Sequence, residues 1–315
     1  MTRLFHSGRR KKSAKAATRA VGGSASDVAA LIQLATRRLQ KAGAFFGHGT
    51  DNAHDEAVAL VLHVMGLPPD SPVSVLKRRV SVAQRARFDE LLDKRATQRV
   101  PLAYLTHESW FAGLPFYVDE RVLIPRSAIA ELIERRFEPW IDPARVRSLL
   151  DMGTGSGCIG LACAKAFPKV RVDASDIDEA ALEVAAINRR RLRLTRRVRL
   201  VKSDHFARLS GASYDIIVSN PPYVGEREMR GLPREYRHEP RHALASGREG
   251  LDSVATILRC AARHLRPLGL LVVEVGNTER ALMRAYPRVP FTWLQFERGD
   301  GGVFLLTREQ LTTFF

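Results

Sequence analysis

From about residue 145 onward, the sequence alternates between strand-like and helix-like segments, and this alternation constrains the fold more than any other feature. Short runs rich in β-branched and aromatic residues predict strands at 147–151, 170–175, 198–202, 214–219, 269–275, 292–297 and 302–307. Helical segments are expected at about 157–167, 178–193 and 250–265. Such alternation is typical of an α/β fold with a parallel, doubly wound sheet. The last two strands are close enough to form a hairpin, so the final strand is expected to run antiparallel.

Residues 24–100 have a helical pattern instead. Ser26 and Asp27 can cap a helix whose apolar residues recur every three or four positions, and further helices are predicted at 55–65 and 81–97. Residues 101–124 are rich in strand formers, with Gly113 where a turn would lie. We therefore divide the chain into a basic tail at 1–23, a small helical domain at 24–100, a hairpin linker at 101–124 and an α/β domain at 125–315.

Positive charge dominates the composition, with 50 Lys and Arg against 34 Asp and Glu and a net charge of +16. Segment 1–23 has no acidic residue and too few apolar residues to offset its ordering entropy, so we expect a disordered tail. The same composition fits an organellar transit peptide or a start codon called too early. The excess of cations indicates a nucleic acid or another polyanion as a partner, and codon bias in a GC-rich genome explains it equally well.

A second basic run, at 188–199, contains seven arginines. Cations favour the carboxyl end of a helix, so a solvated helix end is the first interpretation, and a weak contact with RNA is the second.

Other features narrow the class of protein. The three cysteines, Cys158, Cys163 and Cys260, lack metal-ligand spacing and indicate a reducing compartment, so we expect a cytoplasmic protein. No stretch reaches the ~18 apolar residues that a membrane helix requires. The segment 238–242 matches the His-Glu-x-x-His pattern of zinc proteases, but Pro240 would break the required helix. We expect no metal and no membrane association.

A glycine-rich loop follows the first predicted strand, where the row reads Asp-Met-Gly-Thr-Gly-Ser-Gly over 151–157. Glycines between a first strand and a first helix let a ligand approach the backbone closely. The second strand ends at Asp176, and an acid in that place can bind both hydroxyls of a ribose. The P-loop lysine is absent, which argues against ATP hydrolysis, and the glycine spacing departs from the dinucleotide pattern. These features favour an adenosine cofactor without a pyrophosphate, S-adenosylmethionine.

The fourth predicted strand runs directly into Asn220, Pro221, Pro222 and Tyr223. Two prolines enforce an extended exit, and ligands of open α/β sheets bind at the carboxyl ends of the strands. The Asn220 side-chain oxygen and the Pro221 carbonyl can accept the two N–H groups of a planar NH2 group, and Tyr223 can pack against its face. This arrangement would hold the nitrogen in line with a sulfonium methyl group.

With these two motifs, the chain resembles the seven-stranded S-adenosylmethionine-dependent methyltransferases and, among them, the protein-glutamine N5-methyltransferases. Leu123-Ile124-Pro125-Arg126 and Glu239-Pro240 extend the resemblance, which begins near residue 27. One branch of this family modifies release factors, and the other modifies the third protein of the large ribosomal subunit. The release-factor branch continues Pro-Arg with Pro-Glu-Thr-Glu or Pro-Asp-Thr-Glu, whereas Ser127 follows here. Strings similar to the ribosomal-protein branch lie at 47–57, 101–106, 220–224, 235–240 and 289–294.

The resemblance implies a Rossmann-like methyltransferase domain, a substrate-recognition role for the helical domain, and S-adenosylmethionine as the cofactor. It implies catalytic roles for Asn220, Pro221 and Tyr223, with Pro222 also in the substrate site. It implies cofactor contacts for Gly153, Thr154, Gly155, Ser156, Gly157, Asp176, His205 and Asn220. His205 stands where the family often has tryptophan beside the adenine.

Three functions compete at this point. The first is methylation of a glutamine in a large-subunit ribosomal protein, with the release-factor branch as its nearest variant. The second keeps the chemistry but acts on N6 of adenine or N2 of guanine in a nucleic acid, because the same motif serves exocyclic amines. The third is a ribosome-assembly binding module with a vestigial site, which the two intact motifs disfavour.

Overall fold

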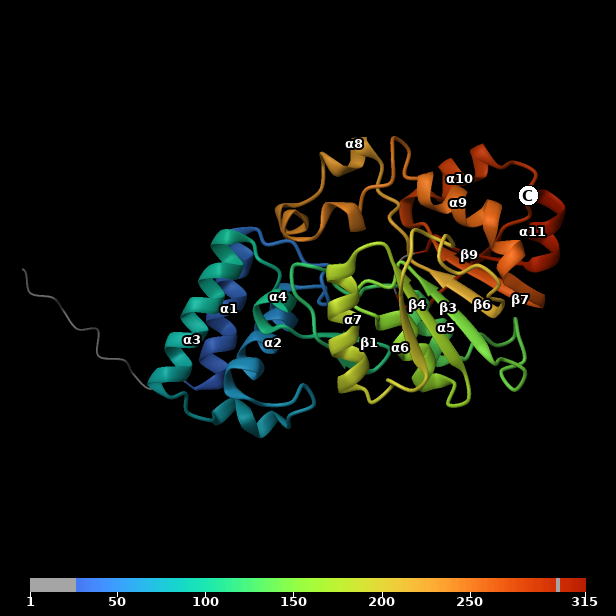
Figure 1. Cartoon of the computed structure of the whole chain (residues 1–315). Coiled ribbons are helices and arrows are strands. Elements are labelled where there is room, and N and C mark those ends of the chain that lie inside the picture. Colours follow the sequence, from blue (N-terminus) through green and yellow to red (C-terminus); the bar gives the residue numbers. More distant parts are fainter. Residues whose placement is uncertain (1–26, 299–300) are drawn as a thin grey trace, which may run out of the picture.

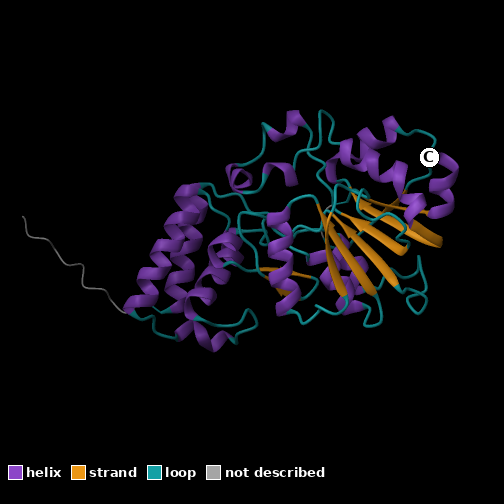
Figure 2. Ribbon diagram, viewed as in Figure 1, coloured by secondary structure: helices purple, strands orange, loops and turns teal. Residues whose placement is uncertain are grey.

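The structure is a computed structural model that describes residues 27–298 and 301–315. The basic tail expected at 1–23 lies outside the described residues. A bundle of helices at one end is joined to a twisted sheet with helices on both faces (Figures 1 and 2).

The sheet has seven strands in the order β5-β4-β3-β6-β7-β9-β8. Neighbours from β5 to β7 pair in parallel, whereas β9 pairs antiparallel with both β7 and β8. This arrangement confirms the doubly wound α/β prediction and the antiparallel final strand. The strands are β3 (Ser148–Met152), β4 (Arg171–Asp176), β5 (Val198–Lys202), β6 (Tyr214–Ser219), β7 (Leu265–Glu274), β8 (Thr292–Leu294) and β9 (Val303–Thr307).

Successive residues of each central strand face opposite sides of the sheet and so enter two different cores. Leu149 packs in the cluster on one face, with residues of α5 and α6, while Leu150 packs in the other, with residues of α9, α10 and α11. Helix α7 packs against β4 and β5. These helices span α5 (Ile129–Glu134), α6 (Cys158–Ala166), α7 (Glu179–Arg191), α9 (Asp252–Ala261), α10 (Glu279–Ala285) and α11 (Arg308–Phe314).

The helical domain forms a separate core. Its helices are α1 (Val28–Ala42), α2 (Ala53–Met65) and α3 (Val82–Asp93), with a π-helical turn at Lys94–Gln98. Each helix begins at a side-chain cap, because Asp27, Asn52 and Ser81 accept hydrogen bonds from the first free backbone N–H groups. The predicted helix boundaries agree closely with the observed ones.

The hairpin is narrower than the 101–124 segment that we expected to form it. Its strands are β1 (Ser109–Phe111) and β2 (Leu114–Phe116), with the turn at Ala112 and Gly113. Helix α4 (Leu102–Thr106) precedes it, begun by Pro101, whose fixed φ suits a helix start. The Tyr104 hydroxyl donates to the Val122 carbonyl at 2.6 Å, so the segment after the hairpin folds back on α4.

Five short α-helices of the described residues were not predicted: α4, α5, α8 (Glu226–Met229), α10 and α11. Each has four to seven residues, which is too few for an apolar repeat to emerge. Strand β7 also begins at Leu265, which was expected to be the last residue of the helix at 250–265.

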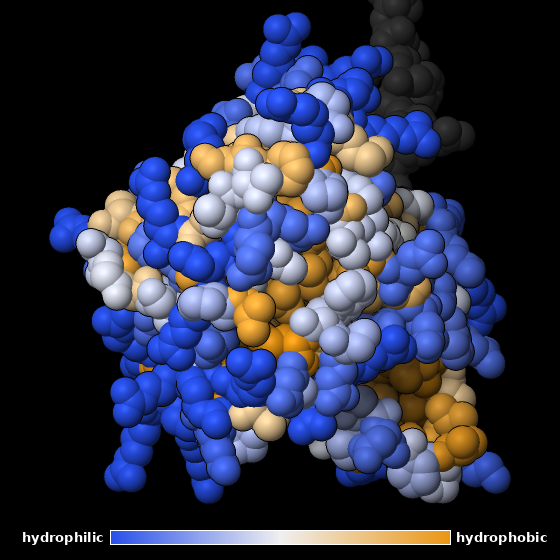
Figure 3. Space-filling view, turned by 90° about the vertical axis from the view of Figure 1, so that its right-hand side faces the viewer, coloured by the Kyte–Doolittle hydropathy of each residue, from blue (hydrophilic) through white to orange (hydrophobic). Residues whose placement is uncertain are grey.

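On the face at the right of Figure 1, polar side chains surround smaller areas of apolar ones (Figure 3). None of the helices in the described part of the chain is long and apolar enough to cross a membrane.

A buried arginine joins the helical domain to the loops above the sheet. Arg95 is only 1% exposed, and its guanidinium donates to Glu56 of α2 at 2.6 Å and to the Phe45 carbonyl at 2.7 Å. Its third bond, 3.0 Å long, reaches Glu235 in the 3-10 helix Arg234–His238. The segment that includes α8 thereby bridges the two domains (Figure 1).

Replacing Arg95 should therefore destabilise the fold strongly. Arg95→Met leaves the Glu56 carboxylate buried without its cation and Glu235 with only Arg99, 3.4 Å away, a loss that typically costs about 3–5 kcal/mol. The matched control is Arg38→Met, because Arg38 and Asp93 form an exposed pair worth at most about 1 kcal/mol. Urea unfolding followed by circular dichroism measures both variants, and equal losses would contradict a structural role for Arg95.

Candidate active site

Two cavities meet at the carboxyl edge of the sheet. The first, of about 400 Å³, lies over the ends of β3, β4 and β6 and is lined by Gly153, Asp176 and His205 among others. The second, of about 620 Å³, lies between the helical domain and the sheet and is lined by residues from both. Asn220 and Pro221 line both cavities. The Asn-Pro-Pro-Tyr segment thus lies between a cavity on the glycine-loop side and a cleft on the helical-domain side.

The glycine loop provides open space at the first cavity. Gly153 and Gly155 line it with φ angles of +70° and +53°, and a Cβ atom at either position would meet no atom within 4 Å. A side chain there would be strained and would occupy space that a ligand needs. This open backbone suits the adenosine cofactor that the sequence predicts.

Thr154, Ser156 and Gly157 were predicted to contact the cofactor, but they do not line this cavity. The Thr154 hydroxyl donates to the buried carboxylate of Asp151, and Ser156 is also buried. A Cβ at Gly157 would lie 2.9 Å from Leu161, so this glycine allows close packing at the start of α6. The three residues stabilise the loop from its side away from the cavity.

Asp176 ends β4 with its carboxylate at the cavity. One oxygen accepts from the Gly155 amide at 2.8 Å and the other from the Asp178 amide at 2.9 Å, which fixes the side chain. Each carboxylate oxygen has further acceptor capacity for a ribose hydroxyl. Burial raises the pKa of Asp176, and the two backbone N–H groups act in the opposite direction.

His205 lies at the far side of the same cavity. Its φ of +45° is unusual for a residue with a side chain, and its ring nitrogens contact Asp204 at 2.6 Å and Ser253 at 2.9 Å. The ring is therefore held in place at the position where the sequence predicts an adenine contact. Further lining residues carried no recognisable sequence signal and come from the loop before α9 and the helix itself: His242, Ser246, Asp252, Ser253 and Thr256.

The segment Asn220-Pro221, called the partition from here on, offers hydrogen-bond acceptors that the described residues leave unused. Among the described residues, none hydrogen-bonds to the Asn220 side chain or the Pro221 carbonyl, although Pro221 is buried. Both groups therefore retain their full capacity toward a ligand at the junction of the two cavities.

Tyr223 is held on the cleft side by close glycine packing. A Cβ at Gly276 would lie 2.6 Å from its ring, and a Cβ at Gly250 would lie 2.1 Å from its carbonyl oxygen. Burial raises the pKa of Tyr223, as does the nearby charge of Glu274, so the phenol stays protonated. A neutral aromatic face in this place can pack against a planar group.

Glu274 is a site residue that the sequence analysis missed. It ends β7, lines the cleft with Tyr223 and is 8% exposed. Its carboxylate accepts from the Ser127 hydroxyl, and hydrogen bonds from the Ala128 amide and Tyr223 also lower its pKa. Burial outweighs these contacts and raises the pKa to about 7. A buried strand gives no sign that its last residue turns toward a cleft.

An ion pair at the wall of the cleft joins the Leu123–Arg126 segment to the Glu239-Pro240 segment. Both segments carry the family resemblance. Glu239 accepts from Arg126 at 2.5 and 2.7 Å and from the Ile124 amide at 3.1 Å. Although burial raises the pKa of Glu239, the charge of Arg126 prevails and lowers it to about 2. Arg126 also lies over the Tyr236 ring, 5.2 Å from its centre.

The His-Glu-x-x-His match at 238–242 has other roles. His238 contacts the Gln98 carbonyl, Glu239 binds Arg126, and His242 pairs with Asp178. Two separate 3-10 helices flank the Glu239-Pro240 step. Within the residues that the structure describes, no group of three or more His, Cys, Asp or Glu side chains is placed to hold a metal ion.

The buried carboxyl group of Glu274 predicts a pH-dependent stability. The folded protein keeps its proton up to about pH 7, whereas the unfolded chain releases it near 4.5, so this group weakens folding as pH rises between those values. Full ionisation costs up to about 3 kcal/mol. Glu274→Gln should therefore gain stability relative to the wild type between pH 5 and pH 8.

Thermal or urea unfolding of both proteins at the two pH values tests this. Asp151, whose pKa burial raises to about 6, is present in both proteins, so its contribution cancels in the difference. A stability difference that stays constant from pH 5 to pH 8 would contradict the assigned burial of Glu274.

Comparison with known proteins gives the family. Residues 137–249 match the family described as the methyltransferase small domain, and residues 30–106 match the PrmC N-terminal domain. The chain is 48% identical over 282 residues to a protein of Neisseria gonorrhoeae named ribosomal protein uL3 glutamine methyltransferase, covering 89% of this chain and 94% of that one. A protein of the same name from Bordetella pertussis is 47% identical over 90% of this chain and 95% of its own.

Among solved structures, the catalytic domain of hMettl16 in complex with a MAT2A 3'UTR hairpin is similar in fold. Its TM-score is 0.50 at 17% identity, with 78% of this chain and 90% of that chain covered. This likeness concerns the fold alone. The two matched domain families and the high identity over nearly the whole length show that the chain belongs to the ribosomal protein uL3 glutamine methyltransferases, whose cofactor is S-adenosylmethionine.

Proposed function

We propose that this chain methylates the side-chain amide nitrogen of a glutamine in ribosomal protein uL3, the third protein of the large subunit. The observation that carries this proposal is the 48% identity over 89% of the chain to an enzyme named for that activity. The position of Asn220 and Pro221 between two cavities supports the same reaction, because each cavity can then hold one of the two reactants.

In the cavity beside the glycine loop, Gly153, Gly155 and Asp176 would hold the cofactor, with His205 beside the adenine. When bound, S-adenosylmethionine supplies a methyl group activated by a positively charged sulfur. These residues contribute binding and orientation, because the open glycine backbone admits the ligand and the fixed carboxylate of Asp176 accepts from ribose hydroxyls.

On the cleft side, the two free acceptors of the partition bind both N–H groups of the target amide. An amide nitrogen is a poor nucleophile because its lone pair is delocalised, and bonding both hydrogens favours the pyramidal nitrogen that forms during attack. Tyr223, packed on Gly276, lies against the amide plane, with Pro222 completing the turn. Alignment of the reactants contributes most of the catalysis.

The competing substrates receive less support. The two relatives described above are named for uL3, and Ser127 departs from the release-factor pattern. The fold likeness to hMettl16 carries no inference about a nucleic-acid substrate at 17% identity. A weak contact between the basic surface and RNA remains part of the proposal, as does a cytoplasmic location, which the free thiols of Cys158, Cys163 and Cys260 favour.

Removal of the Asp176 carboxylate should weaken cofactor binding. Asp176→Ala leaves hydrogen bonds of the ribose unmade, at a cost of about 1–3 kcal/mol. Titration calorimetry with S-adenosylmethionine measures the loss. Asp89→Ala, an exposed carboxylate of α3, is the control and should bind as the wild type does. Unchanged affinity in Asp176→Ala would overturn the ribose assignment.

Removal of the Asn220 acceptor should impair turnover far more than cofactor binding. Asn220→Ala should lower kcat/KM at least ~10²-fold, the scale for losing a positioned transition-state contact. Gln33→Ala is the control, because Gln33 is an exposed amide of α1 that lines neither cavity. We expect less than about a fivefold change in this control, since it leaves the acceptors intact.

The assay offers two substrates separately, uL3 and bare ribosomal RNA, with radiolabelled S-adenosylmethionine. Incorporation at one glutamine of uL3 that is lost in Asn220→Ala supports the proposed function. Incorporation into RNA that is lost in the same variant would reject it in favour of a nucleic-acid methyltransferase.

A further inference from the structure

The arginine-rich segment after α7 forms a hollow of about 500 Å³ lined by Arg190, Arg193, Arg196 and Arg197. It lies where β5 begins, at the amino edge of the sheet, whereas both cavities of the active site lie at the carboxyl edge. None of its lining residues belongs to either active-site cavity. The hollow is therefore a feature that the proposed methyl transfer does not use.

Two neighbouring arginines have structural roles. Arg197 donates to the carbonyls of Ala164 and Phe167 at the end of α6, at 2.6 and 3.1 Å. Arg189 donates to the Val198 carbonyl at 3.1 Å. The end of α6 explains Arg197, because unpaired carbonyls there need donors. Arg189 instead binds a carbonyl of the edge strand β5.

The other three arginines have no such role. Arg190, Arg193 and Arg196 are exposed, and of the described residues none provides them with a carboxylate or hydrogen-bond partner. Some exposed arginines elsewhere have acidic partners, as Arg38 has Asp93 and Arg298 has Glu134. Others in the described part of the chain, such as Arg280, Arg284 and Arg288, have none, so what distinguishes the trio is its clustering on one turn. The trio is thus unneutralised.

Helix termination does not account for Arg193 either. This residue follows the cap of α7 with φ of +58°, a conformation in which glycine or asparagine is usual. An arginine there costs about 1 kcal/mol in backbone energy.

Further cationic side chains lie next to the turn that carries the trio. The Val172 amide donates to the Arg197 carbonyl at 2.9 Å, which brings the start of β4 against the turn. Exposed Lys169 and Arg171 flank this contact in sequence, and neither 164–172 nor 189–198 contains an acidic residue. The cluster therefore has a positive field without nearby compensation.

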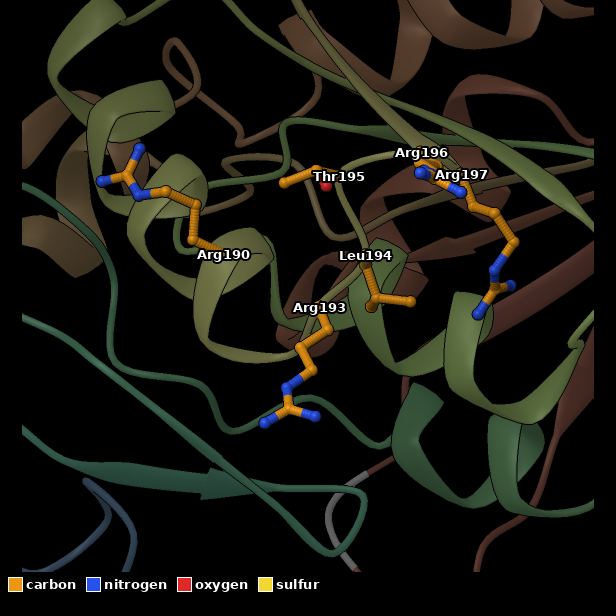
Figure 4. Close-up of a pocket in the computed structure, with 6 residues that line it drawn as sticks. All are labelled: Arg190, Arg193, Leu194, Thr195, Arg196 and Arg197. Carbon is orange, nitrogen blue, oxygen red and sulfur yellow. The ribbon is translucent and has the colours of Figure 1, made fainter.

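The side chains spread apart around the turn, with the guanidinium groups of Arg190, Arg193 and Arg197 pointing in different directions (Figure 4). A single phosphate ion would need converging donors, whereas a chain of phosphates can meet separated ones. Guanidinium groups bind phosphate oxygens in bidentate fashion. A ribosomal protein is associated with ribosomal RNA, so an RNA backbone is the chain of phosphates that this protein would meet.

We infer that Arg190, Arg193 and Arg196 form a docking site for the phosphate backbone of RNA, on the edge of the sheet opposite the active site. This inference rests on the proposed function for the choice of RNA, while binding itself requires neither cofactor nor turnover. The site would hold an RNA-associated substrate without occupying the cleft, and phosphate contacts of this kind position the nucleic acid.

The test compares two triple variants of the full chain that each remove three positive charges. One replaces Arg190, Arg193 and Arg196 with glutamine. The other replaces Arg280, Arg284 and Arg288, which are equally exposed on and after α10, in the same way. Fluorescence anisotropy with a labelled RNA hairpin is recorded at several KCl concentrations, without S-adenosylmethionine.

We expect the cluster variant to bind at least about tenfold more weakly at low salt and to lower the slope of log K against log salt by about 2–3, since each lost phosphate contact removes about 0.7–0.9. The control variant should change affinity less than about threefold. Equal weakening in both variants, or none in either, would overturn the inference.

Methylation of a glutamine peptide separates this inference from the proposed function. The cluster variant should methylate the peptide at the wild-type rate, because the trio lies outside both active-site cavities. Absent peptide methylation in the wild type would reject the proposed function but leave the RNA result intact. A rate loss confined to the cluster variant would show that the trio supports the fold or the active site and would overturn its assignment as a docking site.

Discussion

The ion pair of the half-buried Arg126 with the buried Glu239 is the interaction on which the active-site architecture depends. It joins the segment that precedes the α/β domain to the loop that follows the Asn-Pro-Pro-Tyr turn, and the Ile124 amide adds a third bond to the same carboxylate. Removing either partner would leave a charge buried alone, which is strongly unfavourable. The loop is consequently held over the carboxyl edge of the sheet, where it forms one wall of the cleft.

A second arginine, this one buried, extends this arrangement to the helical domain. Arg95 connects α2 to the 3-10 helix that also includes Tyr236, only a few residues before Glu239. The same loop is therefore fixed at two points, one on each domain. The cleft between the domains has a defined width because charged groups, and not only apolar contacts, set the separation of its walls.

Much of this organisation was readable from the sequence, because local chemistry dictates it. Asp176 was expected at the end of a strand beside the glycine loop, and its carboxylate does accept from Gly155. Glu274 could not be found, since a buried strand residue has no local signature of the cleft it enters. Thr154 was assigned to the cofactor from its place in a motif, yet its hydroxyl faces Asp151, because loop curvature is set by packing with α6.

The partition formed by Asn220 and Pro221 has a kinetic consequence. Under the proposed function each reactant has its own cavity, so the two would meet only at the junction that Asn220 and Pro221 line. Binding in either cavity alone is then not enough for reaction, and the rate depends on how firmly this short segment holds the two reactants in line.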